Sequence, residues 1–173
     1  MELPKPWFNL SEYRRVRLLE ARYEAEIAVN MVREGLVKNT AGKAFKAWKS
    51  FLAAISTGLI NELGKVYGHK VKVRGFDEAL YVVTFMSMTR MFEVSRILNR
   101  LNPMIPYLTL ASPELHRYQY NEPDREGVFS VFRSDEDARE FTCRLLNDMT
   151  VVYRELTKEE FTDLTQCTPK TQT

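Results

Sequence analysis

Apolar residues recur every three or four positions in a long stretch that begins shortly after Asn9. The recurring residues of this stretch are Val16, Leu19, Tyr23, Ile27 and Met31. An asparagine followed three residues later by a glutamate is typical of a helix N-terminus, and Gly35 is a residue type that commonly ends a helix. The pattern therefore predicts an amphipathic helix over residues 9–35, with these five side chains as its apolar stripe.

A second stretch of the same periodicity starts near Asn39 or Thr40 and reaches Gly64. Its apolar positions are Ala41, Ala44, Phe45, Trp48, Leu52, Ile55 and Leu59. Four small residues would let a neighbouring helix approach closely, namely Ala44, Ala47, Ala53 and Ala54. Two long helices joined by a short polar turn are typical of an αα-hairpin, which is the arrangement we expect for the first 64 residues.

The middle of the chain is less regular. Residues 65–76 alternate valines with basic residues and predict a loop or at most a short extended piece. Residues 78–101 are apolar on almost every side, which predicts one central, well-buried helix that stops before Pro103. Ser112 and Pro113 then have the types favoured at an N-cap and at the first helical position, so a short helix is expected to start there.

A last long helix is predicted over residues 135–157, with Ser134 as its N-cap. We expect Phe129 and Phe132 to lie beneath the loop that precedes it. Residues 157–164 predict one more short helix, and residues 165–173 a flexible tail. The chain is thus expected to be a single helical domain over residues 1–173. Its fold class is all-α, an up-and-down bundle of four to six helices with a core of about residues 9–156.

Composition supports this fold class, since 45% of the residues are hydrophobic and the chain has only seven glycines and seven prolines. The formal net charge of +2 hides an asymmetry. Residues 1–75 carry 14 Lys and Arg against seven Asp and Glu, whereas residues 101–173 carry eight against 13. Such halves suit complementary packing within one fold or between subunits. They suit nucleic-acid contact less well, because the whole chain lacks a strong positive field.

Several kinds of site are not expected. Cys143 and Cys167 are too few and too far apart in sequence for a disulfide framework or a four-ligand zinc site. The two histidines, His69 and His116, are also distant from each other, and the chain has no glycine-rich phosphate loop, so we expect no metal and no cofactor. Without a signal-like start or an apolar run near about 18 residues, a soluble cytoplasmic protein with no membrane contact is expected.

Two segments resemble a known family of helical domains. The segment AEIAVNMVREGLVKNTAGKAFKAWKSFLAAI, residues 25–55, resembles the helix pair of HEPN-type domains, in particular their archaeal families. Leu115, His116 and Tyr120 match an LHxxxY-like element found near the last core helix of these domains. The resemblance extends over residues 9–156 and implies a small helical bundle, often a homodimer. Such bundles occur in nucleotide-binding accessory subunits and in RNA-cleaving toxins.

The RNA-cleaving members of that family depend on an arginine that precedes a histidine with four to six residues between them. Before His69 the corresponding positions are Glu62, Leu63 and Gly64. Before His116 they are Thr109, Leu110 and Ala111. The chain therefore departs from the ribonuclease pattern at the residue that defines it.

Residues 111–124 contain the candidate ligand-binding residues His116, Arg117 and Tyr120, and the fourth candidate, Arg125, follows directly. On a helix His116 and Tyr120 share one face, and the ordinary pKa of a histidine lies near neutrality. The two arginines would be cationic donors to a phosphate-bearing ligand. The alternative is structural, with the aromatic rings packed inward and their polar tips bonded to backbone or solvent.

The segment before the central helix contains candidate nucleic-acid-binding residues, which are Lys65, Tyr67, Lys70, Lys72 and Arg74. Cations interleaved with an aromatic ring suit contact with RNA phosphates and stacking on a base. An ordinary solvated connection between helices would have the same composition.

Three functions are compatible with the sequence. The favoured one is a non-catalytic, HEPN-like binding module, a homodimer that engages a nucleotide, RNA or a protein partner. The second is a ribonuclease or nucleotide-handling enzyme that uses His116 as its catalytic residue. The third is an accessory subunit of a nucleotidyltransferase, with no small-molecule site of its own.

Overall fold

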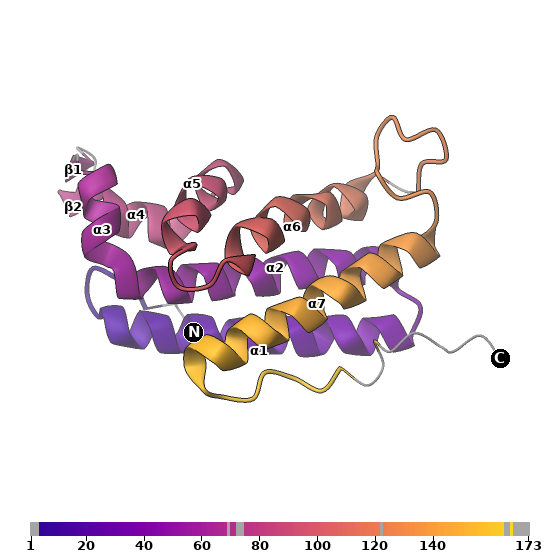
Figure 1. Ribbon diagram of the computed structural model, residues 1–173, viewed down its shortest axis with the longest axis horizontal. Helices are drawn as coiled ribbons and strands as arrows, with labels where there is room; N and C mark the ends of the chain where they lie inside the picture. Colours follow the sequence, from indigo (N-terminus) through magenta and orange to yellow (C-terminus); the bar gives the residue numbers. More distant parts are fainter. Residues whose placement is uncertain (1–3, 69, 72–74, 122, 165–166, 168–173) are drawn as a thin grey trace.

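The computed structural model describes residues 4–68, 70–71, 75–121, 123–164 and 167 (Figure 1). Its elements, in chain order, are α1 (Leu10–Arg33), α2 (Val37–Ser56), the 3-10 helix η1 (Thr57–Leu59), α3 (Ile60–Val66), β1 (Lys70–Val71), β2 (Phe76–Asp77), α4 (Glu78–Phe85), α5 (Met88–Leu98), α6 (Met104–Tyr120) and α7 (Asp135–Thr157). The two short strands form an antiparallel pair with Lys70 opposite Asp77. The prediction of an all-α bundle is confirmed.

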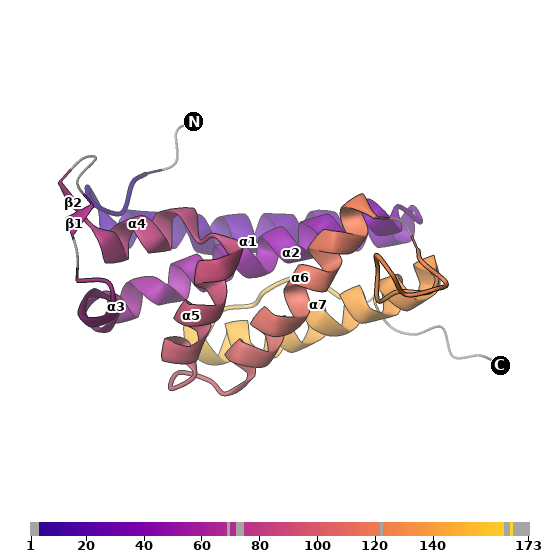
Figure 2. The ribbon, with the colours of Figure 1, turned by 90° about the horizontal axis from the view of Figure 1, so that it is seen from above.

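α1 and α2 form the predicted hairpin and lie side by side along the molecule (Figure 1 and Figure 2). The Oδ1 atom of Asn9 accepts a hydrogen bond from the backbone N–H of Glu12 at 3.0 Å, which confirms the predicted N-cap. Gly35, with φ of 75°, makes the left-handed turn after α1. The second helix starts at Val37, slightly earlier than predicted, and gives way to η1 and α3 well before Gly64.

The buried face of α1 is not the predicted one. Its buried side chains are Tyr13, Ala21, Ala25, Ala28, Val29 and Val32. By contrast Leu19 and Ile27 are more than one third exposed, and Tyr23 is 57% exposed. The small residues decide the outcome, because the alanine face of α1 packs with α2, where Ala44 and Ala47 are fully buried. Alanine on both helices lets the two backbones approach closely, as the small residues of α2 predict.

The stretch predicted as one central helix, residues 78–101, is divided into α4 and α5. Met86 ends α4 with a left-handed φ of 39°, and Ser87 is the N-cap residue of α5. The segment is also not buried on every side, since Tyr81 is 40% and Phe85 53% exposed. The prediction of one central, well-buried helix is therefore wrong.

Side chains of α1 account for this break. The Tyr13 hydroxyl donates a hydrogen bond to the carbonyl of Val83 at 3.0 Å, and the Arg17 guanidinium donates to the carbonyl of Thr84 at 3.2 Å. In an unbroken helix these two carbonyls would accept hydrogen bonds from the backbone N–H groups four residues later. Because α1 supplies donors in their place, the chain can turn at Met86.

α6 runs without interruption through the point where Ser112 and Pro113 predict the start of a separate helix. Pro113 has no N–H, so the carbonyl of Thr109 loses its usual intrahelical donor. The Ser112 hydroxyl donates to that carbonyl at 3.2 Å and replaces the missing bond. Trp48 of α2 donates to the Thr109 hydroxyl at 3.1 Å, which holds α6 against α2. Ser112 is therefore a buried helical residue and not an N-cap.

The start of α7 follows the prediction. The Oγ atom of Ser134 accepts a hydrogen bond from the backbone N–H of Asp137 at 3.1 Å. The loop before it meets the prediction in part, because Phe132 is buried whereas Phe129 is 72% exposed.

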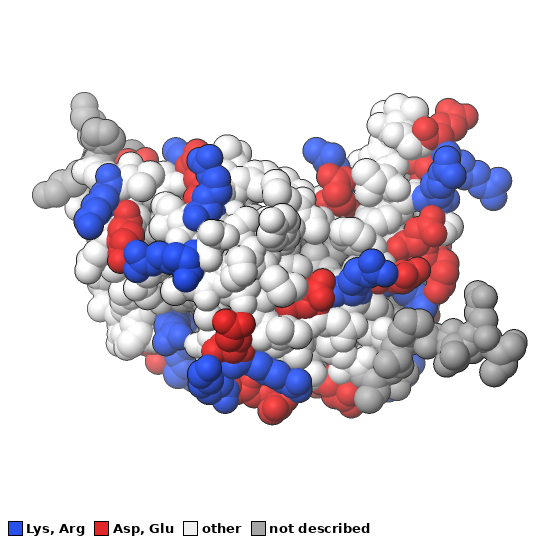
Figure 3. All heavy atoms as spheres, viewed as in Figure 1, with Lys and Arg blue, Asp and Glu red and all other residues white. Residues whose placement is uncertain are grey.

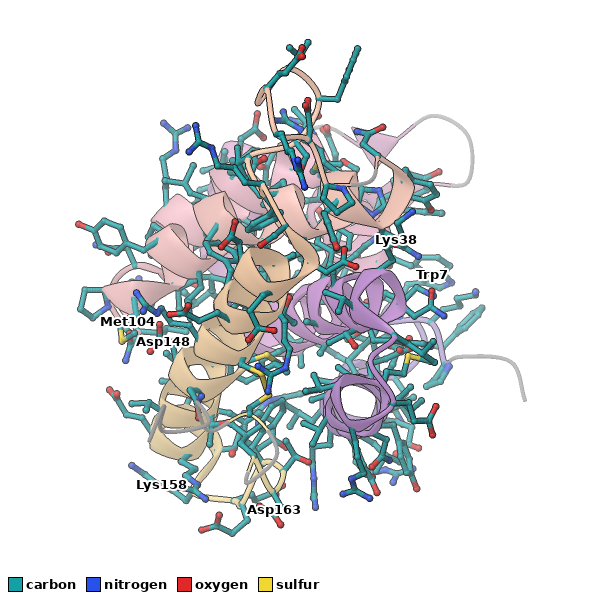
Figure 4. All side chains as sticks on the ribbon, turned by 90° about the vertical axis from the view of Figure 1, so that its right-hand side faces the viewer. Trp7, Lys38, Met104, Asp148, Lys158 and Asp163 are labelled. Carbon is teal, nitrogen blue, oxygen red and sulfur yellow. A yellow bond between two sulfur atoms is a disulfide. The ribbon has the colours of Figure 1, made fainter. Side chains whose placement is uncertain are left out.

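After α7 the chain continues as an irregular strap, residues 158–164, in place of the predicted short helix. Phe161 of the strap is buried and packs on Tyr153 with 4.6 Å between ring centroids. Cys167 then forms a disulfide with Cys143 of α7, 24 positions earlier (Figure 4). The two cysteines, expected to be too few and too far apart in sequence for a disulfide framework, thus form one disulfide, because the strap brings the chain back to α7. The rest of the predicted flexible tail lies outside the described residues.

Candidate functional site

His116, near the end of α6, lies against an aromatic side chain of α2. Its ring stacks on Phe45 with 4.5 Å between centroids, and Tyr120 meets it edge-on at 5.2 Å. Burial, and after it the positive charge of Lys49, hold the pKa of His116 below its ordinary value. Its Nδ1 atom is buried and has no hydrogen-bond partner among the described residues. These contacts favour a neutral imidazole that contributes packing.

The other candidate residues of this segment point to separate environments. Arg117 forms a surface ion pair with Glu114, one turn earlier on α6, at 3.0 Å. Tyr120 is 71% exposed apart from its contact with His116. Arg125 is exposed in the loop between α6 and α7. Among these four candidate residues, the structure thus shows one direct contact, between the rings of His116 and Tyr120.

A cavity of about 710 Å³ lies between α3 and α5, at the end of the molecule that also carries the strand pair (Figure 1). It is lined by Val66, Tyr67, Glu78, Arg90, Glu93, Arg96 and Ile97. Two guanidinium groups and two carboxylates therefore face a cavity whose remaining walls are apolar or aromatic. A few polar groups converging in an apolar pocket are typical of a ligand site.

A hydrogen-bond network fixes one side of this cavity. The Tyr67 hydroxyl donates to the Glu93 carboxylate at 2.6 Å, and Arg90 donates to the same oxygen at 2.7 Å. The Arg90 guanidinium also lies over the Tyr67 ring, 5.3 Å from its centroid. Burial, and then Glu93, raise the pKa of Tyr67 to about 12, while hydrogen bonds from Tyr67 and then Arg90 lower the pKa of Glu93. Near neutral pH, Tyr67 is thus a neutral donor to an ionised Glu93.

The residues predicted to contact nucleic acid lie at this same end where the structure describes them. Lys65 is exposed in the last turn of α3, and Lys70 is in β1. Tyr67 is 5% exposed, so its ring forms part of the cavity wall and is not presented for stacking on a base. Lys72 and Arg74 lie outside the described residues.

Arg90, Glu93 and Arg96 were not singled out from the sequence, because residues 78–101 predict a helix buried on every side. The signal that could have found them is charge, since residues 60–100 carry seven Lys and Arg against four Asp and Glu. Basic and acidic side chains lie next to one another over this end of the molecule (Figure 3). Arg96 is exposed and forms no ion pair with another described residue.

The two groups of predicted residues do not form one site. α6 ends beside the loop that leads to α7, at the end of the bundle opposite to α3 and the strand pair (Figure 1 and Figure 2). His116 therefore lies at the opposite end of the molecule from Lys65, Tyr67 and Lys70, the described residues of the predicted nucleic-acid contact.

A smaller cavity, of about 490 Å³, lies between α1, α7 and the strap. Both arginines of its lining bind residues of the strap. Arg154 forms an ion pair with Glu160, and Arg22 donates a hydrogen bond to the carbonyl of Phe161 at 3.2 Å. The cavity between α3 and α5 is the better candidate for a ligand site, because Arg96 lines it without such an ion pair within the described part of the chain.

The described residues contain neither a membrane-spanning helix nor a metal-ligand cluster. None of their helices is both long and apolar enough to cross a membrane. No three of their histidine, cysteine, aspartate or glutamate side chains gather as they would around a metal ion.

Comparison with known proteins gives a family. No curated protein and no solved structure matches the chain. The model of the Archaeal PaREP1/PaREP8 family matches residues 16–143, from α1 into α7. The match covers more than half of the chain and includes both the cavity between α3 and α5 and His116. The chain therefore belongs to the archaeal PaREP1/PaREP8 family.

Proposed function

We propose that the protein is a non-catalytic, HEPN-like binding module that acts as a homodimer and holds a phosphate-bearing ligand, a nucleotide or RNA, between α3 and α5. The observation that carries this proposal is the cavity of about 710 Å³ lined by Arg90 and Arg96. A planar guanidinium offers paired N–H donors that match the geometry of a phosphate group.

The two arginines have different parts in this proposal. Arg90 is held by the Glu93 carboxylate and by the Tyr67 ring, so its guanidinium is positioned before a ligand arrives. Arg96 has no ion-pair partner among the described residues, so it can bind a phosphate without first breaking a bond of that kind. Glu78 also lines the cavity, and its carboxylate is a suitable acceptor for a ribose hydroxyl.

The surroundings of the cavity support an anionic ligand. Lys65 and Lys70 lie at the same end of the molecule, and the described residues between 60 and 100 include five Lys and Arg against four Asp and Glu. A single-stranded RNA that ran from the cavity along α3 would contact the cavity arginines, Arg90 and Arg96, and then Lys65. Each phosphate neutralised in this way makes the affinity for RNA more sensitive to salt.

The non-catalytic part of the proposal is supported by His116. Its ring is stacked on Phe45, its pKa is lowered by burial, and the positions that would hold the arginine of a ribonuclease motif hold other residues. The HEPN-like part is supported by the hairpin of α1 and α2, which contains the segment of residues 25–55 that resembles the helix pair of that family.

Fluorescence anisotropy with labelled ATP and with labelled single-stranded RNA tests the proposal and distinguishes the two ligands. Arg96→Ala should weaken binding by about 10-fold to 100-fold, because a hydrogen bond to a charged group contributes about 1.5–3 kcal/mol. Arg144→Ala is the matched control, since Arg144 is also an exposed helical arginine but lies on α7. Failure of the wild type to bind either probe, or equal binding by the Arg96 variant, would overturn the proposal.

A further inference from the structure

The outward face of α1 carries an apolar stripe that no part of the described chain covers fully. Leu19 is 39%, Tyr23 57% and Ile27 37% exposed, with the half-buried Val16 and Met31 at the two ends of the row. At a rise of about 1.5 Å per residue the stripe is about 22 Å long. Side chains on the outer side of α1, the lower of the two purple helices in Figure 4, point away from the bundle.

This stripe is unusual because the opposite face of α1 already fills the core with Ala21, Ala25 and Ala28. A helix on the surface of a monomer normally places charged and polar residues on the side away from the core. A continuous row of large apolar side chains on that side marks an interaction surface.

The charges of α1 identify the occupant of that surface. The 13 residues before Tyr23, residues 10–22, carry four arginines and two glutamates, a net charge of +2. The 13 residues after it, residues 24–36, carry three glutamates and one arginine, a net charge of −2. A second α1 that runs antiparallel therefore places unlike halves together, and the two helix dipoles then also attract each other.

We infer that the stripe of Val16, Leu19, Tyr23, Ile27 and Met31 binds the same stripe of a second copy of this chain, antiparallel and with Tyr23 at the two-fold axis. The inference rests on the homodimer of the proposed function and gives that homodimer its interface. A two-fold contact of this type is self-complementary, because Leu19 of each copy meets Ile27 of the other and only Tyr23, on the axis, meets its own counterpart. Arg22 and Glu26 lie one turn apart beside Tyr23, so the Glu26 carboxylate of each copy can reach the Arg22 guanidinium of the other, which also donates to the Phe161 carbonyl of its own chain.

Charge reversal at the axis tests this arrangement. Light-scattering masses are measured for the wild type, for Tyr23→Glu, for Tyr23→Lys and for an equimolar mixture of the two variants. The wild type should be a dimer, and each variant alone should dissociate at concentrations about 10-fold higher or more, because like charges meet at the axis. The mixture should dimerise again, since Glu then faces Lys. Tyr23 is more than half exposed, so the fold, checked by circular dichroism, should not change.

Val151→Glu on α7 is the control, because Val151 has the same 57% exposure as Tyr23 and lies outside the stripe. This variant should remain a dimer. A monomeric wild type would overturn the homodimer of the proposed function together with this interface. A dimer that both Tyr23 variants leave intact would overturn the interface alone. Variants that are monomeric both alone and when mixed would overturn the two-fold position of Tyr23.

Discussion

The end of α6 and the cavity between α3 and α5 contrast in how they collect polar residues. At the end of α6 a histidine, two arginines and two tyrosines are close in sequence, yet His116 stacks on Phe45 and Arg117 pairs within its own helix. At the cavity the polar groups come from three helical regions and converge on one space. A helix spreads neighbouring residues around its axis, so proximity in sequence does not make a site.

The largest expected effect is on ligand affinity, which should depend on the arginines of the cavity and not on those at the end of α6. Replacing both Arg90 and Arg96 with alanine should weaken the binding of labelled RNA or ATP by about 100-fold or more, since two hydrogen bonds to charged groups are lost. Replacing both Arg117 and Arg125 with alanine should leave the affinity unchanged. Fluorescence anisotropy measures both, and equal losses at the two ends would contradict the contrast.

Stability should distinguish the two ends next. Tyr67→Phe removes the hydrogen bond to Glu93 and should lower the free energy of unfolding by about 1–2 kcal/mol. His116→Phe keeps the ring stacked on Phe45 and should stay within about 0.5 kcal/mol of the wild type. Urea denaturation gives both values.

Incubation of the His116 variant with total RNA should give the same pattern of RNA fragments as incubation of the wild type. Loss of a cleavage activity in this variant would restore His116 as a catalytic residue.

The pH dependence of stability should reveal the buried state of His116. Because the pKa of His116 is lowered in the folded protein, the unfolded chain takes up the proton first as the pH falls. The stability that the neutral ring contributes should be complete above about pH 6.5 and should be lost as the pH falls from there through the folded-state pKa. Urea midpoints between pH 5 and pH 8 should decline less in His116→Phe. Identical pH profiles for the two proteins would rule out this role.

The smallest effect is spectroscopic and concerns Tyr67. Its pKa of about 12 lies above the ordinary value of 10.0, so its contribution to stability is complete below pH 10 and is lost as the pH rises toward 12. The difference in tyrosinate absorbance between the wild type and Tyr67→Phe should show a phenol that ionises near pH 12. A difference curve centred near pH 10 would mean that the network with Glu93 does not hold in solution.

Local signals in the sequence were sufficient for several parts of the fold. Asn9 and Ser134 cap their helices as predicted because a cap depends on residues within one turn. Gly35 makes the predicted turn for the same reason. The small residues of α2 likewise indicated a close helix neighbour.

The features that were missed depend on distant partners. α1 has two faces with apolar residues, and which one is buried is decided by the alanines of α2. The break at Met86 depends on Tyr13 and Arg17, and the uninterrupted α6 depends on a hydroxyl that compensates for Pro113. The cavity could not be predicted, because its walls belong to helices whose ends the periodicity did not locate.

The corner at Met86 has a consequence for the order of folding. The hydrogen bonds that support it join residues 70 and 67 positions apart. Before α1 docks, the apolar sequence of residues 78–101 has no local reason to bend. We therefore expect this segment of a newly made chain to form one straight helix first. It would acquire its angle, and with it the placement of α5 beside α3, late in folding, after the slow closure of a long loop.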